Sequence, residues 1–391
     1  MKVALLTGAG ISYGCGLPTV EVLTQSLFEE EWHNHTDECF YPGIHPNPYY
    51  QKENLVYRIK PFLRILYNYA EKYLGNRNLG KPTYEDLFYL AAQISDEVSG
   101  MIINPAISLF FDAVNKQANN LYKPLGVGHR ALTLRYLSEK TTHYIQDVVQ
   151  NKLSTNAVPE NLDLILEMAS DEAITRLDIY TLNHDLLIEN LFAQNEIEYA
   201  DCFDKPTGDI RRYNSSTYDS EVKVKLYKLH GSINWYMFMN QKIEQPLSYI
   251  GMPTINDVNH CKDSNGNLIT NISGRPYFLT GTYNKIFDYD LGLYAEILTR
   301  FQNSIEEHDK LIVSGYGWKD QSINRRILRW IYSNDNRKII CLHKDFLQEL
   351  ENKSAINMLV RHKDLIDLNQ SIIIDEWLSE ISISDISKYL K

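Results

Sequence analysis

The chain has 391 residues, of which 44% are hydrophobic and 23% are charged, an ordinary composition for a globular protein. A single hydrophobic core rarely grows that large, so we expect two lobes or one domain with a large insertion. The formal net charge of −11 argues against a broad phosphate-binding surface, and therefore against strong intrinsic nucleic-acid binding. We interpret the basic group of Arg325, Arg326 and Arg329 as a solvated helix face.

The cysteines lie far apart in the sequence and form no CxxC pair: Cys15, Cys39, Cys202, Cys261 and Cys341. A tetrahedral zinc site built from two CxxC pairs is therefore excluded, and no zinc is expected. An odd number of cysteines spread over a long chain also argues against a disulfide framework. The apolar N-terminal stretch runs straight into glycines and no transmembrane run follows, which predicts a cytoplasmic protein without a membrane segment.

The first fifty residues predict the start of an α/β domain. The apolar run Val3–Leu6 predicts a strand, and Gly8–Gly10 predicts a tight turn after it. Pro18 and Thr19 then open a helix with apolar side chains at helical spacing. Residues 33–50 are rich in histidine and proline and predict an irregular loop, with a histidine metal site as the alternative.

From residue 51 to residue 170 the apolar pattern is almost wholly helical. Leu55, Ile59 and Phe62 begin one apolar face, and Thr83 followed by Asp86 resembles a capping arrangement before an apolar run. This block carries no chemical motif, and we interpret it as a helical insertion between two halves of an α/β core. Its role stays open between a lid, an oligomer interface and plain packing.

Strand patterns return after residue 175 and alternate with helix patterns. Val222–Leu226 alternates apolar residues with lysines, which predicts a half-exposed strand, and residues 240–275 predict a loop or hairpin excursion. The other predicted strands are Leu177–Thr181, Leu311–Ser314, Lys338–Leu342 and Ser371–Ile374, and the predicted helices are Leu186–Phe192 and Ile323–Ile331.

This alternation predicts an α/β fold, with a Rossmann-like, doubly wound parallel sheet and a large all-helical insertion. The predicted division assigns residues 1–50 to the first part of the core, 51–170 to the insertion and 171–391 to the second part of the core.

Two glycine-containing turns follow predicted strands. In Gly8–Ser12 the glycines would let the backbone approach a diphosphate, whose charge free N–H groups and the helix dipole would hold. Tyr13 stands where the third glycine of a full dinucleotide fingerprint would fall. Ser314–Gly317 could face adenine or a phosphate. Either turn could also be a plain strand-to-helix connection.

Polar side chains follow two further strands. Thr181, Asn183 and Asp185 lie in an extended segment whose alternate residues point the same way, so they could bond a carboxamide, a ribose hydroxyl and a water. Asn183 or Asp185 could instead cap the next helix. His230 could act as a general base or polarise a hydroxyl, and Gly231 would admit a ligand to close range. With eleven histidines in the chain, His230 could equally be structural.

Taken together, these four segments favour one ligand site over separate structural turns, because the carboxyl ends of parallel strands meet at one edge of a sheet. In this order, the strings GAGIS, GLP, TxNxD and LHG resemble the sirtuin signature, at Gly8–Ser12, Gly16–Pro18, Thr181–Asp185 and Leu229–Gly231. The longer strings Lys228–Trp235 and Ser314–Asp320 are more similar to divergent bacterial sirtuin-like proteins of antiphage defence. The resemblance covers residues 1–30 and 175–345.

The resemblance implies an NAD site. Sirtuins bind NAD in an extended pose and release nicotinamide. The expected catalytic residues are Asn183 and Asp185, beside the nicotinamide and its ribose, and His230, as the base that orients the ribose hydroxyls. The residues expected to bind NAD, from the phosphates to the adenosine half, are Gly8, Ala9, Gly10, Ser12, Pro18, Thr181, Gly231, Ser314 and Gly315.

Two departures separate this chain from protein-deacylating sirtuins. Those proteins usually carry a zinc ribbon with two CxxC pairs, which this sequence lacks. They also have a Phe-Arg step after the first turn, where this chain has Thr19-Val20-Glu21. An acyl-lysine channel therefore has no support, whereas both departures suit the antiphage proteins, which are NAD hydrolases.

The resemblance thus predicts an NAD glycohydrolase that takes NAD as its substrate and gives nicotinamide and ADP-ribose. It implies a gated effector of antiphage defence that forms a homo-oligomer and, as in one branch of these proteins, works with a HerA-like ATPase. The alternatives are a non-catalytic NAD or ADP-ribose sensor, a protein deacylase and a nuclease. Acidic charge and the lack of a paired-carboxylate metal motif count against a nuclease.

Overall fold

The computed structural model describes residues 1–34, 39–51, 54–76, 80–100, 107–122, 132–155, 157–239, 248–281, 292–344, 346, 365–366 and 369–390. The chain divides into two compact units. Unit 1 contains Met1–Leu17, Ser154–Leu279 and Ile286–Lys391, and unit 2 contains Pro18–Leu153 with a short segment that begins at Thr280. The division predicted from the sequence, at residues 50 and 170, differs from these bounds and stays a prediction.

Unit 1 is built on a seven-stranded parallel sheet with the order β13-β12-β11-β1-β4-β7-β5. Its strands are β1 (Lys2–Thr7), β4 (Arg176–Thr181), β5 (Tyr199–Ala200), β7 (Val224–Lys228), β11 (Lys310–Ser314), β12 (Lys338–Leu342) and β13 (Ser371–Ile374). The chain first adds strands on one side of β1, starting with β4, and later on the other side, starting with β11. The strand order therefore reverses between β1 and β11, which makes this the topological switch point.

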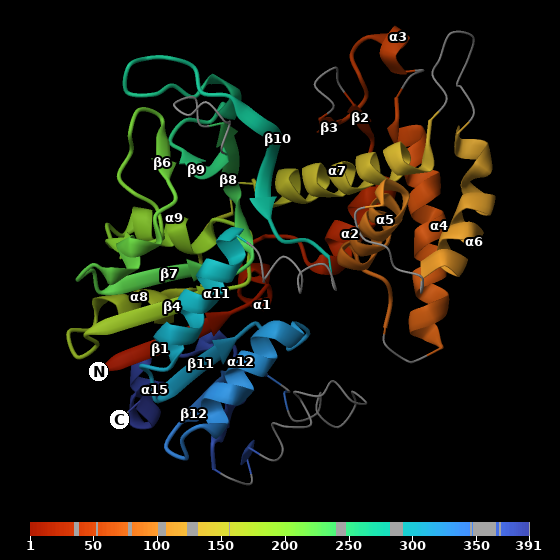
Figure 1. Cartoon of the computed structure of the whole chain (residues 1–391). Coiled ribbons are helices and arrows are strands. Elements are labelled where there is room, and N and C mark those ends of the chain that lie inside the picture. Colours follow the sequence, from red (N-terminus) through yellow and green to blue (C-terminus); the bar gives the residue numbers. More distant parts are fainter. Residues whose placement is uncertain are drawn as a thin grey trace. The chain divides into compact units, whose positions relative to one another are not determined.

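Helices cover both faces of this sheet (Figure 1). One face packs against α8 (Asp163–Ser170), α9 (Leu187–Gln194) and α15 (Ile383–Leu390), and the other against α11 (Gly292–Ile305) and α12 (Gln321–Tyr332). Side chains of β1 alternate between the two faces, since successive residues of a strand point to opposite sides. Helices on both faces of a parallel sheet confirm the predicted Rossmann-like α/β fold.

A second sheet in unit 1 is antiparallel, with the order β10-β8-β9-β6. Its strands are β6 (Ile210–Arg212), β8 (Gly231–Met239), β9 (Ser248–Pro253) and β10 (Asn271–Phe278). The sequence predicted a loop or hairpin over 240–275. The structure bears out the hairpin alternative, because the consecutive strands β8 and β9 pair antiparallel. It also extends the prediction, because β9 and the start of β10 belong to a four-stranded sheet that buries its own apolar cluster, including Phe238 and Ile269.

Unit 2 is mainly helical (Figure 1). Its elements are α2 (Val20–Glu29), β2 (Trp32–Asn34), β3 (Phe40–Pro42), α3 (Pro48–Gln51), α4 (Val56–Gly75), α5 (Tyr84–Ser99), α6 (Ser108–Ala118) and α7 (Leu134–Leu153). The predicted cap of α5 is confirmed, because the Asp86 carboxylate accepts the Thr83 N–H at 2.8 Å. The predicted loop over 33–50 includes the pair β2 and β3, whose three-residue strands are too short to show alternation.

Strand β7 corrects a prediction about exposure. The alternating lysines predicted a half-exposed strand, but every residue of β7 is buried. Lys225 and Lys228 are 7% and 4% exposed. Each ammonium has a local acceptor: Lys225 donates to the Tyr218 carbonyl at 2.5 Å, and Lys228 pairs with Glu189 at 2.7 Å. A buried lysine is tolerated when such partners replace water.

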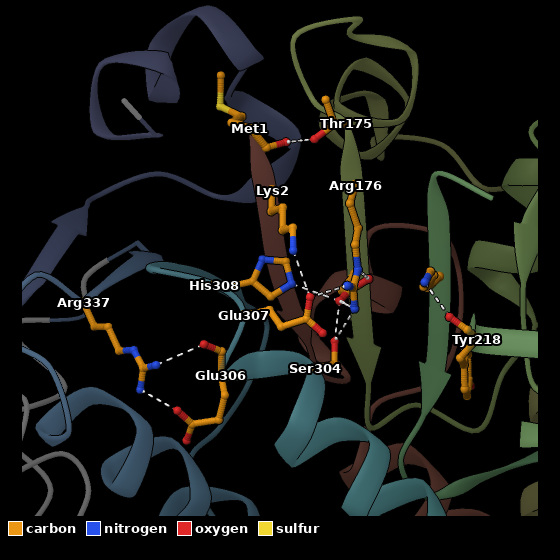
Figure 2. A network of polar contacts seen from close by, with 12 residues as sticks. Met1, Lys2, Thr175, Arg176, Tyr218, Ser304, Glu306, Glu307, His308 and Arg337 are labelled. Atoms are coloured by element: carbon orange, nitrogen blue, oxygen red, sulfur yellow. Dashed lines mark hydrogen bonds and ion pairs between the residues drawn. The ribbon is translucent and has the colours of Figure 1, made fainter. Parts of the chain in front are cut away.

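A polar cluster joins β4, β1 and the end of α11 (Figure 2). The fully buried Asp178 carboxylate accepts two hydrogen bonds from the Arg176 guanidinium, at 2.9 and 2.7 Å, and one from His308 Nε2 at 2.9 Å. Glu307 bonds both Lys2 and Arg176, which point toward it in Figure 2. Burial alone would raise the pKa of Asp178, but the bonds from His308 and Arg176 outweigh it and lower that pKa.

Among the residues that the structure describes, no helix combines the length and the apolar character needed to cross a membrane.

Candidate active site

Four polar segments leave the same edge of the parallel sheet. Thr7, at the end of β1, is in register with Thr181 of β4 and Ser314 of β11. Thr181 is in turn in register with Lys228 at the end of β7. The segments that follow these four strands therefore begin side by side, on both sides of the switch point. In open α/β sheets this edge is where ligands bind.

Asn183, Ser12 and Asp185 form a buried chain of hydrogen bonds at this edge. The Asn183 amide donates to Ser12 Oγ at 2.9 Å and to the Gly8 carbonyl at 3.2 Å. Ser12 Oγ donates in turn to Asp185 Oδ2 at 2.9 Å. Ser12, Asn183 and Asp185 are 5%, 8% and 7% exposed. An amide, a hydroxyl and a carboxylate from two different loops thus stand in one row.

Asp185 also serves the helix that follows it. Its Oδ1 accepts the N–H of Leu187, the first residue of α9, at 3.0 Å. The helix-cap alternative therefore applies to Asp185 in addition to the network, whereas the Asn183 amide bonds the turn after β1. Thr181 Oγ1 accepts the backbone N–H of Asn183 at 3.2 Å and so fixes the bend after β4.

Lys228 ties this segment to the end of β7. Its buried ammonium donates to the main-chain carbonyl of Asp185 and pairs with the Glu189 carboxylate. Burial raises the pKa of Glu189, although the Lys228 ammonium acts in the opposite direction. With little water to compete, these contacts hold the Asp185 segment beside the strand that leads to His230.

His230 is paired with a carboxylate that the sequence analysis did not assign. The His230 Nε2 and Asp320 Oδ2 atoms are 3.0 Å apart, and both side chains are nearly buried. Asp320 lies at the end of the string Ser314–Asp320 noted in the sequence, but its pairing with a residue 90 positions away depends on the fold. No local pattern in the sequence signals it.

His184 is a second imidazole that the sequence analysis missed. It lies between Asn183 and Asp185 and is buried. Its ring centroid is 4.6 Å from that of Phe278 and 6.0 Å from that of His230. Two imidazoles therefore stand close together beside the Asn183 network.

The glycines of the two turns pack against each other. A Cβ on Gly10 would stand 2.6 Å from Gly315 Cα, and a Cβ on Gly8 would stand 2.6 Å from the Gly315 carbonyl oxygen. Gly315 has φ +64°, and its carbonyl accepts the Gly10 N–H at 2.9 Å. We expected these glycines to admit a diphosphate. The close approach of the two backbones already requires them, and the Gly10 N–H is engaged.

Gly231 also differs from expectation. Its φ is +77°, and a Cβ there would stand 2.5 Å from the Tyr277 carbonyl oxygen and 2.8 Å from the Tyr294 hydroxyl. The space that was expected to admit a ligand is therefore filled by β10 and α11. This glycine is needed for packing, and its contact with NAD stays a prediction.

The other expected NAD-binding residues have simple surroundings. Ala9 is exposed, and its carbonyl accepts the Ser12 N–H at 3.2 Å. The buried Ser314 hydroxyl donates to the Leu342 carbonyl at 3.4 Å. Pro18 belongs to unit 2. Their roles toward NAD stay predictions.

Within the described ranges, no group of three or more His, Cys, Asp or Glu side chains could hold a metal ion. In the histidine segment, His33 Nδ1 lies 2.9 Å from the Gly43 carbonyl, and the His33 and His45 rings are 5.0 Å apart. His35 lies outside the described residues. None of the five cysteines forms a disulfide with another described residue.

One part of the chain is similar to a known protein family. Residues 178–362 match the family described as SIR2-like domain. The match begins within β4 and covers the segments that hold Asn183, His230 and Asp320.

Several solved structures of Sir2 proteins are similar to this chain at low identity. A Sir2 homologue in complex with NAD is 15% identical with a TM-score of 0.35, over 100% of this chain and 91% of that one. Sir2Tm bound to a propionylated peptide is 11% identical with a TM-score of 0.36, over 99% and 93%. Sir2 with the inhibitor EX-527, 2'-O-acetyl-ADP-ribose and a deacetylated p53 peptide is 11% identical with a TM-score of 0.37, over 100% and 94%. No curated protein sequence matches the chain.

Proposed function

We propose that this protein hydrolyses NAD to nicotinamide and ADP-ribose. The observation that carries the proposal is the buried row of Asn183, Ser12 and Asp185 at the switch point of a SIR2-like domain, with the His230–Asp320 pair on the adjoining segments. Sirtuin homologues bind NAD. The row offers an amide, a hydroxyl and a carboxylate, which are the groups needed to hold a ribose, a water and a developing positive charge.

The proposed reaction is dissociative. The bond between ribose C1' and the nicotinamide nitrogen breaks, and its electron pair stays with nicotinamide, which leaves neutral. The ribose becomes oxocarbenium-like, and the negative Asp185 carboxylate would stabilise that charge. A water near Asn183 adds to C1' and loses a proton, which His230 takes up. The products are nicotinamide, ADP-ribose and one proton.

The test is nicotinamide release from NAD by purified protein. We expect turnover by the wild type and a loss of about 100-fold or more in Asn183→Ala and His230→Ala. Asn195→Ala is the matched control, because that exposed asparagine bonds a backbone carbonyl at the far end of α9. It should keep wild-type turnover. Undiminished turnover by Asn183→Ala would remove the basis of the proposal.

The same assay separates the rival activities. A deacylase would consume NAD only when an acetyl-lysine peptide is added, and would form O-acetyl-ADP-ribose. A sensor would bind NAD or ADP-ribose, as measured by calorimetry, without releasing nicotinamide. Water-dependent release without peptide supports the hydrolase.

We also propose that the enzyme is a gated antiphage effector in the bacterial cytoplasm, as a homo-oligomer with a HerA-like ATPase as partner. Unrestrained NAD hydrolysis would damage the cell that makes it, so activity should depend on assembly or infection. Cells expressing the wild type should lose NAD on phage infection, and cells expressing Asn183→Ala should not. Light scattering that finds a lone monomer at every concentration, with or without the ATPase, would contradict the assembly.

A further inference from the structure

Asp320 is held from both sides of its carboxylate. Oδ1 accepts the backbone N–H groups of Ser322 and Ile323, at 2.9 and 3.1 Å, and so caps α12. Oδ2 lies 3.0 Å from His230 Nε2. The Asp320 main-chain carbonyl accepts the Tyr316 hydroxyl at 3.2 Å, which fixes the backbone as well. The carboxylate thus has one orientation, set by the helix start.

This orientation determines how His230 can carry a proton. A carboxylate accepts hydrogen bonds and donates none, so it favours a proton on His230 Nε2. Neutral His230 then carries its acceptor lone pair on Nδ1, which is the nitrogen that takes up a proton during the proposed reaction. When it does so, the imidazolium is stabilised by the adjacent negative charge.

Other groups beside His230 also affect its protonation, so the pairing with Asp320 matters for where the positive charge lies. His184, after β4, presents a second imidazole whose ring centroid is 6.0 Å from that of His230, and Phe278 of β10 packs against His184 with its ring tilted. The Tyr294 hydroxyl of α11 lies by Gly231. Protonation of two nearby imidazoles at the same time is unfavourable, because like charges repel each other. Asp320 Oδ2 lies 3.0 Å from His230 Nε2, so its negative charge favours protonation of His230.

We propose that Asp320 is a positioning residue for His230: it fixes the tautomer and orientation of that imidazole and stabilises its protonated form. The proposal rests on the proposed function for its catalytic consequence, but not for its effect on His230. Its helix-capping role alone would produce neither a defined tautomer nor a charge preference.

The test is Asp320→Asn, which keeps an oxygen that can cap α12 but removes the charge. With histidines labelled by ¹³C at Cε1, and His230 assigned through His230→Gln, we expect NMR titration to show that the pKa of His230 falls by about 1–3 units in Asp320→Asn. We expect kcat for NAD to fall about 100-fold or more with KM changed by less than about threefold. The low-pH limb of kcat/KM should move to lower pH, together with the pKa of His230.

Asp257→Asn is the matched control. Asp257 also accepts a backbone N–H at the start of a short helix and bonds a histidine, His260, at 2.6 Å, but on the exposed surface. It should leave kcat and the pKa of His230 unchanged. An unchanged pKa of His230 in Asp320→Asn would overturn the proposal, even if the variant lost activity or stability, because only the cap would then be involved. The titration needs no turnover, so absence of NAD hydrolysis in the wild type would count against the proposed function alone.

Discussion

The Ser12 hydroxyl acts as both hydrogen-bond acceptor and hydrogen-bond donor, toward two different side chains. Its oxygen accepts from the Asn183 amide and its proton goes to the Asp185 carboxylate. This arrangement leaves the hydroxyl one orientation. The Asn183 amide is aligned as well, because its nitrogen must face Ser12 and Gly8. The direction of each bond is therefore set by the carboxylate at the end of the row.

Ser12→Ala should break this row. It removes one partner each from Asn183 and Asp185, and unpaired buried polar groups cost about 1–3 kcal/mol of folding free energy. We expect the urea midpoint of unfolding to fall by an amount that corresponds to this free energy. We also expect NAD hydrolysis to fall at least as strongly as in Asn183→Ala. Ser216→Ala removes an exposed serine bonded to Asn214 and should change stability by less than about 0.5 kcal/mol. A Ser12→Ala protein as stable as wild type would show that water replaces the hydroxyl.

The sequence predicted single residues of the site better than pairs. Asn183 and Asp185 stand out because polar residues alternate after an apolar strand, which is a local pattern. Asp320 and His184 belong to the candidate site because they lie beside His230, and both contacts join residues that are far apart in the sequence. An ordinary helix cap and an ordinary histidine look the same in the sequence whether or not they face a site.

At the scale of elements, the turns after β1 and β11 are bound to each other. Gly8 and Gly10 meet Gly315 backbone to backbone, with no room for a Cβ on either side. The sequence indicated glycine turns at strand ends correctly. It could not show that the turns touch, because their distance in the chain is large and only the strand order brings β11 beside β1.

Gly10→Ala should therefore be costly. The new Cβ would overlap the Gly315 backbone, which cannot move without parting the two turns, and overpacking of this kind costs about 1–3 kcal/mol. Gly14→Ala is the control, since its Cβ would meet only the Asn161 side chain, at 3.9 Å. We expect a lower thermal midpoint for Gly10→Ala alone. Equal midpoints for the two variants would mean that the turns separate easily.

Strand β7 shows a second limit of sequence patterns. Alternating lysines usually indicate a solvated face, yet Lys225 is buried because the Tyr218 carbonyl lies within reach. Lys228, at the end of the strand, is buried beside Glu189 and the Asp185 carbonyl. We predict that Lys228→Met destabilises the protein by about 3–5 kcal/mol, because the largely buried Glu189 carboxylate loses its cation. Adding Glu189→Leu should restore most of that loss in urea unfolding. No recovery in the double variant would show that the Asp185 carbonyl is the important partner.

At the scale of the whole of unit 1, acid sensitivity should centre on the Asp178 cluster in Figure 2. The pKa of Asp178 is lowered from its ordinary 3.8, so the native protein holds this proton less tightly than the unfolded chain does. The carboxylate therefore stabilises the fold above about pH 4, and this contribution is lost as pH falls through the lowered pKa.

We expect wild-type unfolding free energy, measured in urea, to fall steeply from about pH 4 downward, and less steeply in Asp178→Asn. That variant should also be less stable at neutral pH, because Arg176 and His308 lose a buried partner. Asp335→Asn, at an exposed carboxylate, should keep the wild-type slope. Parallel slopes for wild type and Asp178→Asn would assign the acid sensitivity to other carboxylates.

The contact between Gly10 and Gly315 also has a consequence for synthesis. A ribosome has made most of the chain before Gly315 appears, so a nascent chain carries the turn after β1 without the strand that closes it. Fragments from early termination would lack Asp320 beside His230 as well. For a protein proposed to destroy NAD, this order of synthesis would keep incomplete chains inactive while translation proceeds.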